Sequence, residues 1–556
     1  MLPILSLGIM ATFTDKTTFL LKSLKVITFF YIVFSIVMLL VDTVIYPHWG
    51  IRLDATILTY LNTPTEMLAS LKSSQLLIAV VIFISSVSLT YFFFSKIISK
   101  NFAKTSSRDL SIFAIYFVLI VIGIRGGLQK TSINHSNIYF STNQYANHLA
   151  NNGVWNFGHS YFNEIYNQDN PYALLQEGKA HKIAYTRIKE IHEVKSSDKK
   201  ILNCSNPNII LIIWESLTAK VVGPLNGYPD VTPNLNRLSN EGLLFTNFYA
   251  NGDRSDKGLV SILSGYYPQC KKSIIKTPTK SKNLPFITKP FVDSSYNCSF
   301  YYGGDLNFGN MNSYLLNAGL NEIVSGADFD KKNWNSKWGV HDHVVLEKAF
   351  DDLKLEGTSS FFKTIFTLTS HEPYEIPEEP RFKEDTEIDR FKSAHYYTDH
   401  SINQFLEKAK KEDWWDNTLV IITADHGHRL PILKGNHNAP QKFHIPMLWI
   451  GGALDSTGVI ENFGSQKDIG YTLLSELNYT NQLADYPFSK NLLIHSSKNY
   501  AHYIFNNGYG TIDKNGSVLY DYHAQKIIES SGTDIDTLEL LGQALTQSAY
   551  QDYLDR

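Results

Sequence analysis

The chain has 556 residues, more than one compact core usually contains, so we expect more than one folded unit. Its charge is nearly balanced, with 50 Lys and Arg against 53 Asp and Glu, which argues against a nucleic-acid partner because such partners usually require a strongly basic surface. The three cysteines form no CxxC pair, so a thiolate zinc site is not expected. In an oxidising compartment Cys270 and Cys298 are candidates for a disulfide.

Three apolar segments in the first quarter of the chain are predicted to span a membrane, at about 26–46, 75–95 and 110–124. Lysines and arginines precede the first segment and fill the loop between the second and the third, so the positive-inside rule places both stretches in the cytoplasm. We therefore predict a transmembrane region at 1–126 in a multi-pass protein of the inner or plasma membrane, with the rest on the extracytoplasmic side. The apolar residues 1–10 are too short to span, and we interpret them as a truncated span or an interfacial piece.

The remaining chain is predicted to form a linker and one catalytic domain. Residues 127–200 are polar and rich in Asn, Ser and Tyr, which favours a linker or tether. Over 201–556 fully apolar runs of strand length alternate with helical patterns, which predicts an α/β fold with a mostly parallel sheet covered by helices on both faces. The stretch around Asn506-Asn507-Gly508 predicts a C-terminal hairpin, and a final helix follows it.

Polar residues follow four of the predicted strands, at the edge where open α/β sheets bind ligands. "NIILIIW" is followed by Glu215, "LLFTNFYA" leads to Ser255, "FFKTIFTLTS" ends at His371, and "TLVIITA" ends at Asp425 and His426. Two carboxylates and an imidazole suit a divalent cation, which would activate a serine hydroxyl as a nucleophile. Each motif alone is also typical of a plain helix cap or turn. Their joint occurrence at successive strand ends favours a metal site.

Four segments in this order resemble the lipoteichoic acid synthase-like branch of the alkaline phosphatase and sulfatase superfamily: "NIILIIWESL", "VTPNLNRLSNEGLLFTNFYANGDRSDKG", "FTLTSHEPYEIP" and "ITADHGH". The resemblance implies one divalent ion, Mn²⁺ or Zn²⁺ with Mg²⁺ as a further candidate. It implies that the metal ligands are Glu215, Ser255, Asp425 and His426. Ser255 would be the nucleophile, and His371 and His437 would contact the substrate phosphate or the leaving group.

The resemblance also implies the reaction. Family members move a phosphoglycerol or phosphoethanolamine group from a phospholipid of the bilayer to an envelope glycan, lipid or polymer, through a covalent phospho-enzyme. Two departures stand out. The nucleophile is Ser255 where many relatives have threonine, and in "GGDLNFGNMN" Phe308 and Asn310 replace the Trp and Arg that grip phosphoglycerol in the polymerases. We still expect Asp305 and Asn310 in this stretch to bind substrate.

Three other functions are compatible with this sequence to different degrees. A sulfatase requires a Cys or Ser followed by x-Pro-x-Arg, and the Asp-Lys-Gly after Ser255 disfavours that chemistry. A phosphatase or phosphodiesterase would hand the same covalent intermediate to water and stays open. A membrane-anchored binding module without catalysis would be favoured by the loss of a metal-site residue, and all four are present.

Overall fold

The computed structural model divides the chain into two compact units, Met1–Asp169 and Asn170–Arg556. It describes residues 17–49, 52–53, 57–58, 73–97, 107–128, 133, 135–138, 140–141 and 144–556, apart from 165–168, 177, 195–199, 271, 358, 384–385, 433–434, 507 and 523. The apolar stretch 1–10 lies outside the described residues.

The first unit is helical. Its described helices are α2 (Thr17–Trp49), α4 (Ser73–Ile97), α5 (Ser107–Arg125), η2 (His135–Ile138), α6 (Gln144–Ala150) and α7 (Gly153–Glu164). Two of them contain segments long and apolar enough to cross a membrane, Leu21–Val44 in α2 and Leu77–Lys96 in α4. The third predicted span lies in α5, whose apolar part, Ala114–Arg125, is shorter than a full crossing.

An eight-stranded sheet forms the centre of the second unit, in the order β5-β4-β6-β1-β7-β8-β2-β9. Its strands are β1 (Asn208–Trp214), β2 (Leu243–Phe245), β4 (Asn297–Tyr302), β5 (Glu322–Val324), β6 (Phe361–Phe366), β7 (Thr418–Ala424), β8 (Met447–Ile450) and β9 (Gly458–Ile460). Only β8 runs antiparallel to its neighbours β7 and β2. All residues of β1 and β7 are buried, as expected for strands covered on both faces. The predicted fold class is confirmed.

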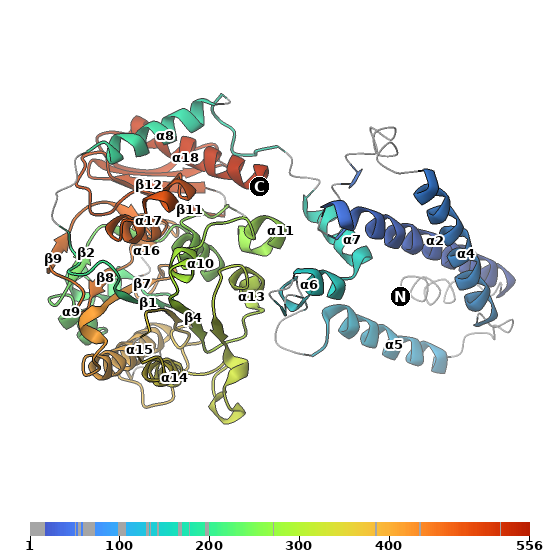
Figure 1. Cartoon of the computed structure of the whole chain (residues 1–556), viewed down its shortest axis with the longest axis horizontal. Helices are drawn as coiled ribbons and strands as arrows, with labels where there is room; N and C mark the ends of the chain where they lie inside the picture. The colour runs from blue at the N-terminus through green and yellow to red at the C-terminus, as the bar shows by residue number, and fades with distance from the viewer. Residues whose placement is uncertain are drawn as a thin grey trace. The chain divides into compact units, whose positions relative to one another are not determined.

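Helices cover both faces of this sheet. Figure 1 shows α14 and α15 on one side of β1 and β7, and α10 and α17 on the other. The α-helices of the unit are α8 (Lys179–His192), α9 (Pro233–Leu238), α10 (Ser255–Ser264), α11 (Pro278–Ser281), α12 (Lys289–Asp293), α13 (Met311–Leu315), α14 (Asp342–Leu355), α15 (Glu387–Ala409), α16 (Pro440–Phe443), α17 (Asp468–Glu476) and α18 (Ile535–Asp555). Single 3₁₀ turns are η4 (Ala219–Val221), η5 (Gly223–Leu225), η6 (Ile274–Lys276), η7 (Phe308–Asn310), η8 (Gly326–Asp328), η9 (Lys331–Asn333), η10 (Trp415–Asn417) and η11 (Thr480–Asp485).

Two smaller sheets complete the second unit. One pairs β3 (Phe248–Tyr249) with β10 (Gly464–Ser465), and the other is an antiparallel meander of β11 (Tyr500–Phe505), β12 (Gly508–Asp513), β13 (Gly516–Asp521) and β14 (Lys526–Gly532). The predicted hairpin is therefore the first half of a four-stranded sheet. The final helix α18 packs against this sheet, and the Tyr509 hydroxyl donates a hydrogen bond to the Glu539 carbonyl.

The range predicted as a linker contains helices, and one of them belongs to the second unit. Helix α8 lies beside α18 (Figure 1). It buries a narrow stripe of Ala180, Ala184, Ile188 and Ile191, and the rest of its surface is polar. A stripe this narrow lowers the overall hydrophobicity of the segment, which is why its composition is typical of a tether.

The candidate disulfide is not formed. No disulfide links Cys204, Cys270 or Cys298 to another described cysteine. Cys298 lies on β4 in the main core, whereas Cys270 belongs to a separate buried cluster with Tyr172 and Ile504. Because each thiol is buried among apolar side chains of a different cluster, both act as small core residues.

Candidate metal and nucleophile site

The first site residue, Glu215, follows the central strand β1 and is buried. Its backbone N–H donates to Thr367 Oγ1 at 2.9 Å, and its carbonyl accepts a hydrogen bond of 2.6 Å from Ser370 Oγ. Ser216 turns the chain here with a φ of 59°, in the left-handed region, and its hydroxyl donates to Glu215 Oε1 at 2.7 Å. The backbone of Glu215 is therefore fixed by two hydrogen bonds, and the Ser216 hydroxyl orients its carboxylate.

Asp425 and His426 follow β7, the parallel neighbour of β1. Asp425 is fully buried, and its Oδ1 accepts hydrogen bonds from the backbone N–H groups of Ser216 at 2.8 Å and His426 at 2.7 Å. Gln466 fixes the backbone turn at Asp425, because its side-chain amide donates a hydrogen bond of 2.6 Å to the Asp425 carbonyl. Two adjacent strand ends are thus tied together by hydrogen bonds.

Ser255 is the first residue of α10, and its Oγ lies 3.4 Å from Glu215 Oε2. The residue before it, Arg254, occupies the N-cap position in an extended conformation, so the serine is not the helix cap. Gly258, one turn later, packs against the Asp425 carbonyl so closely that an added Cβ would lie 1.8 Å from that oxygen. This glycine lets the start of α10 reach the carboxylates, with its backbone N–H groups and dipole favouring an anion.

The three candidate ligands converge. One ligand atom each from Glu215, Asp425 and His426 lies within 4.8 Å of the others. His426 Nε2 is 3.5 Å from both Glu215 Oε1 and Asp425 Oδ2. Among the described residues no hydrogen-bond donor reaches the buried Asp425 Oδ2. An orphaned carboxylate oxygen between a second carboxylate and an imidazole fits a divalent cation.

The electrostatics of the cluster support this assignment. Burial raises the pKa of Asp425, and the neighbouring Glu215 carboxylate raises it further. Burial also acts to raise the pKa of Glu215, but the hydrogen bond from His426, the charges of His371 and His426, and the hydrogen bond from Ser216 together outweigh burial and lower this pKa. Burial acts to lower the pKa of His426, yet the two carboxylates raise it to about 10. Without a cation the imidazole therefore carries the proton that balances the acids.

Binding of a divalent cation should therefore release protons. A metal-bound imidazole must be neutral, so His426 loses its proton, and Asp425 must be ionised. We expect about one cation per chain, with an affinity that falls about tenfold per pH unit for each proton released as the pH is lowered from 8 to 6. Titration calorimetry with Mn²⁺ or Zn²⁺ in buffers of different ionisation enthalpy measures both quantities.

Glu215→Gln tests the assignment of this ligand in the same titration, because it removes one ligand charge and keeps the side-chain shape. It should lose at least tenfold in affinity. A pH-independent affinity, or equal binding by this variant, would contradict a cation held by Glu215, Asp425 and His426.

His371 lies near this cluster, half-buried beyond β6. Its Nδ1 is 2.9 Å from the Glu372 carbonyl oxygen, which can only accept, so Nδ1 carries the proton and Nε2 is the acceptor. The ring contacts Trp338 at 4.3 Å between centroids, and Trp338 in turn contacts Phe308 at 5.1 Å. Trp338 has no motif that would have identified it from sequence.

The remaining predicted substrate residues are placed differently. Asp305 is exposed and its Oδ1 accepts a hydrogen bond of 2.9 Å from the Asn307 backbone, as in a turn. Asn310 is buried, has a φ of 65° and precedes α13. Gly309 between them lies beside the first turn of α10, since its added Cβ would be 3.7 Å from Asp256 Cβ. A substrate-binding role for Asp305 and Asn310 stays a prediction.

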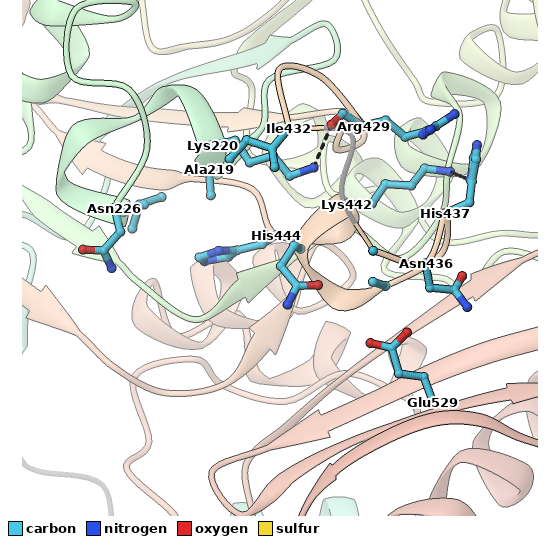
Figure 2. A pocket seen from close by; sticks show the side chains of 14 residues that line it. Ala219, Lys220, Asn226, Arg429, Ile432, Asn436, His437, Lys442, His444 and Glu529 are labelled. Carbon is cyan, nitrogen blue, oxygen red and sulfur yellow. Dashed lines mark hydrogen bonds between the residues drawn. The ribbon is translucent and has the colours of Figure 1, made fainter.

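His437 is exposed and lies outside the carboxylate cluster, in a pocket shown in Figure 2. Its Nδ1 is 3.5 Å from Lys442 Nζ. Two further cations of this pocket, Lys220 and Arg429, belonged to no motif in the sequence. They come from loops after β1 and β7, and only the fold brings them together.

Comparisons with known proteins agree with this geometry. A family model described as "Sulfatase" matches residues 207–479. Lipoteichoic acid synthase 2 of Bacillus subtilis is 25% identical over 244 residues, covering 42% of this chain and 36% of the relative. Lipoteichoic acid synthase of Staphylococcus saprophyticus is 27% identical over 244 residues, covering 42% and 37%. The match thus spans little more than a third of either relative.

Solved structures share the fold. A Vibrio parahaemolyticus protein described as a member of the alkaline phosphatase superfamily has a TM-score of 0.58 and 25% identity, covering 67% of this chain and 96% of its own. The lipoteichoic acid synthase LtaP of Listeria monocytogenes has a TM-score of 0.54 and 19% identity, covering 67% and 98%. Residues 207–479 therefore form a sulfatase domain of the alkaline phosphatase superfamily, and this domain is distantly homologous to the lipoteichoic acid synthases.

Proposed function

We propose that the chain is a membrane-anchored transferase that moves a phosphoglycerol or phosphoethanolamine group from a phospholipid to an acceptor in the cell envelope. The observation that carries this proposal is the Ser255 hydroxyl, which begins a helix 3.4 Å from a buried carboxylate of the Glu215, Asp425 and His426 cluster. A serine needs such activation to act as a nucleophile. The names of the curated relatives, lipoteichoic acid synthases, support the substrate class.

The residues that would hold the divalent ion, Mn²⁺ or Zn²⁺ with Mg²⁺ as a further candidate, are Glu215, Ser255, Asp425 and His426. When bound, the ion supplies positive charge that favours the ionised serine and the developing charge on the phosphate. The chain itself orients the carboxylates and places the positive N-terminal end of α10 beside them. The sheet keeps bulk water away from the buried carboxylates of Glu215 and Asp425.

Two displacement steps follow from this arrangement. Ser255 Oγ forms a bond to phosphorus while the bond from phosphorus to the diacylglycerol oxygen breaks, and the hydroxyl proton is given up. His371 Nε2, the acceptor nitrogen of its ring, takes up the proton that Ser255 gives up and passes it to the departing diacylglycerol oxygen. In the second step an acceptor hydroxyl forms the new bond to phosphorus, its proton leaves, and the Ser255 oxygen is released as a hydroxyl.

We further propose that the apolar helices of residues 1–126 cross the inner or plasma membrane and that the sulfatase domain works on the extracytoplasmic side. Lys16, Lys22 and Lys25 precede the apolar part of α2 in the sequence. Lys96, Lys100, Lys104 and Arg108 lie in the sequence between the apolar parts of α4 and α5, which supports cytoplasmic positions for both stretches. Phospholipid of the outer leaflet would then be the donor, and envelope glycan, lipid or polymer would be the acceptor.

The test is to trap the covalent intermediate. Full-length protein is incubated with vesicles that contain phosphatidylglycerol or phosphatidylethanolamine, and the digest is analysed by mass spectrometry. We expect diacylglycerol as a product and a phosphoglycerol or phosphoethanolamine adduct on the peptide from Asn251 to Leu259. An adduct on another residue, or none with either lipid, would contradict the proposal.

The same assay separates the hydrolase alternatives. Release of the head group to water in the presence of every acceptor tested would favour a phosphodiesterase. Turnover of an aryl sulfate but of no phospholipid would favour a sulfatase, although Lys257 and Leu259 stand where a sulfatase needs a proline and an arginine.

A further inference from the structure

Gln466 lies between β10 and α17, and its side chain is fully buried. Its Nε2 donates hydrogen bonds to the carbonyls of Ala424 at 2.7 Å and Asp425 at 2.6 Å. Its Oε1 accepts a hydrogen bond of 2.9 Å from the Asn251 N–H. Because a carbonyl only accepts and an N–H only donates, these partners determine which end of the amide is the nitrogen. One planar group therefore joins two backbone segments that are far apart in the sequence.

The two joined segments carry a candidate metal ligand and the candidate nucleophile. Asp425 follows β7, whereas Asn251 begins the loop that enters α10 at Ser255. Asn251 is fully buried; its Oδ1 accepts a hydrogen bond of 2.9 Å from the Lys467 N–H, and its Nδ2 donates to the His502 carbonyl at 2.8 Å. The loop of the nucleophile is thus attached to the turn before α17 through both its backbone and a side chain.

The Asp425 carbonyl that accepts from Gln466 also packs against α10. An added Cβ on Gly258 would lie 1.8 Å from this oxygen, so the contact contains no side chain of the helix. The hydrogen bonds of Gln466 therefore limit how far the Asp425 turn and the start of α10 can move relative to each other. Ser255 Oγ lies 3.4 Å from Glu215 Oε2 in this arrangement, and a shift of the loop would change that distance.

Asn462 is a second buried amide of the same domain and serves as a comparison. Its Nδ2 donates to the carbonyls of Leu492 at 2.9 Å and Ile494 at 3.1 Å. Its Oδ1 accepts a hydrogen bond of 2.9 Å from His495 Nδ1. Asn462 makes the same kinds of hydrogen bond as Gln466, but it joins the loop after β9 to the loop after η11. Loss of either amide should therefore lower stability similarly, whereas only the loss of Gln466 should change the site.

We propose that Gln466 is a positioning residue that sets the separation between the metal ligand Asp425 and the loop that carries Ser255. This inference rests on the proposed function, in which Ser255 is both the nucleophile and a metal ligand. The amide acts through the backbone of the two segments and not on the substrate. Groups that are already held at the right separation need little rearrangement, so these hydrogen bonds favour both cation binding and attack on phosphorus.

The test compares Mn²⁺ binding by full-length variants in phosphatidylcholine nanodiscs, measured by titration calorimetry at one fixed pH. Gln466→Met keeps most of the side-chain volume and removes the amide. We expect this variant to weaken Mn²⁺ binding about tenfold or more. Asn462→Leu is the matched control. It should bind Mn²⁺ within about twofold of wild type, although its thermal stability falls by a similar amount.

A second measurement uses Ser255→Ala, which removes the hydroxyl at the other end of the bridge. In this background Gln466→Met should cost at least about threefold less Mn²⁺ affinity than in wild type, because part of its effect is exerted through Ser255. Equal costs in the two backgrounds would show that the amide holds only the Asp425 turn and would overturn the proposal. An affinity of Gln466→Met equal to that of Asn462→Leu would overturn it as well.

Gln466→Glu decides the question if Gln466→Met does not fold. A glutamate keeps an acceptor for the Asn251 N–H but presents an oxygen to at least one of the two carbonyls. It should weaken Mn²⁺ binding about threefold or more, and an affinity equal to that of the control would contradict the proposal. None of these measurements requires turnover of phospholipid. Their failure therefore concerns Gln466, whereas failure of the adduct test concerns the transferase function.

Discussion

Ser255→Ala is expected to lower head-group transfer by several orders of magnitude, because no covalent intermediate can form without the hydroxyl. The fold should persist, since Arg254 and not Ser255 occupies the N-cap position and alanine favours helix. We expect a change of no more than about 0.5 kcal/mol in the free energy of unfolding. Diacylglycerol release from phospholipid vesicles measures the first effect, and thermal unfolding measures the second.

Two further variants sharpen this test. Ser255→Thr keeps a hydroxyl at the same helix position and should retain part of the activity. Ser530→Ala makes the same chemical change on the exposed strand β14 and should leave turnover at the wild-type level. Near-normal turnover in Ser255→Ala would mean that the Ser255 hydroxyl is not the nucleophile and that another group attacks the phosphorus.

Asp468→Asn is expected to destabilise the sulfatase domain by about 3 to 5 kcal/mol, the usual result of removing one partner from a buried ion pair. Asp468 is fully buried between two fully buried lysines. Its Oδ2 is 2.7 Å from Lys490 Nζ, and its Oδ1 is paired with Lys467. The lysines also lie over aromatic rings, Lys467 at 5.0 Å from Tyr267 and Lys490 at 4.7 Å from Tyr500. An asparagine would leave two cations in the core without a counter-charge.

Chemical unfolding of the full-length protein measures this loss, with Asp485→Asn on the exposed turn η11 as the matched control. The control should change stability by less than about 0.5 kcal/mol. Burial acts to raise the pKa of Asp468, but the two lysines outweigh it and lower the pKa. The stabilisation from this carboxylate is therefore present at neutral pH and is lost as the pH falls through that lowered pKa. A loss of stability no larger than that of the control would show that the two lysines are solvated.

The sequence predicted the central sheet and the convergence of Glu215, Asp425 and His426 for one physical reason. Strands covered on both faces are continuous apolar runs, and those of "NIILIIW" and "TLVIITA" are adjacent and parallel as expected. Because parallel neighbours end at the same edge, Glu215, Asp425 and His426 had to meet. The start of α10 after "NGDR" is also a local property, and the helix begins at Ser255.

Other features depended on contacts between distant parts of the chain, which no local pattern contains. The polar helix α8 joins the second unit only because α18 offers a partner for its narrow stripe. The sequence allowed a disulfide between Cys270 and Cys298, yet these residues lie in different clusters of buried side chains. Lys220 and Arg429 are 209 residues apart, and each alone is an ordinary basic residue of a loop. The residue types and the pattern of apolar residues in each segment determined which segments are strands and where the polar residues at their ends lie. Both depend on residues that are neighbours in the sequence. Which isolated charges share a cavity or a buried ion pair was decided by tertiary packing, because that depends on how loops from separate strands meet.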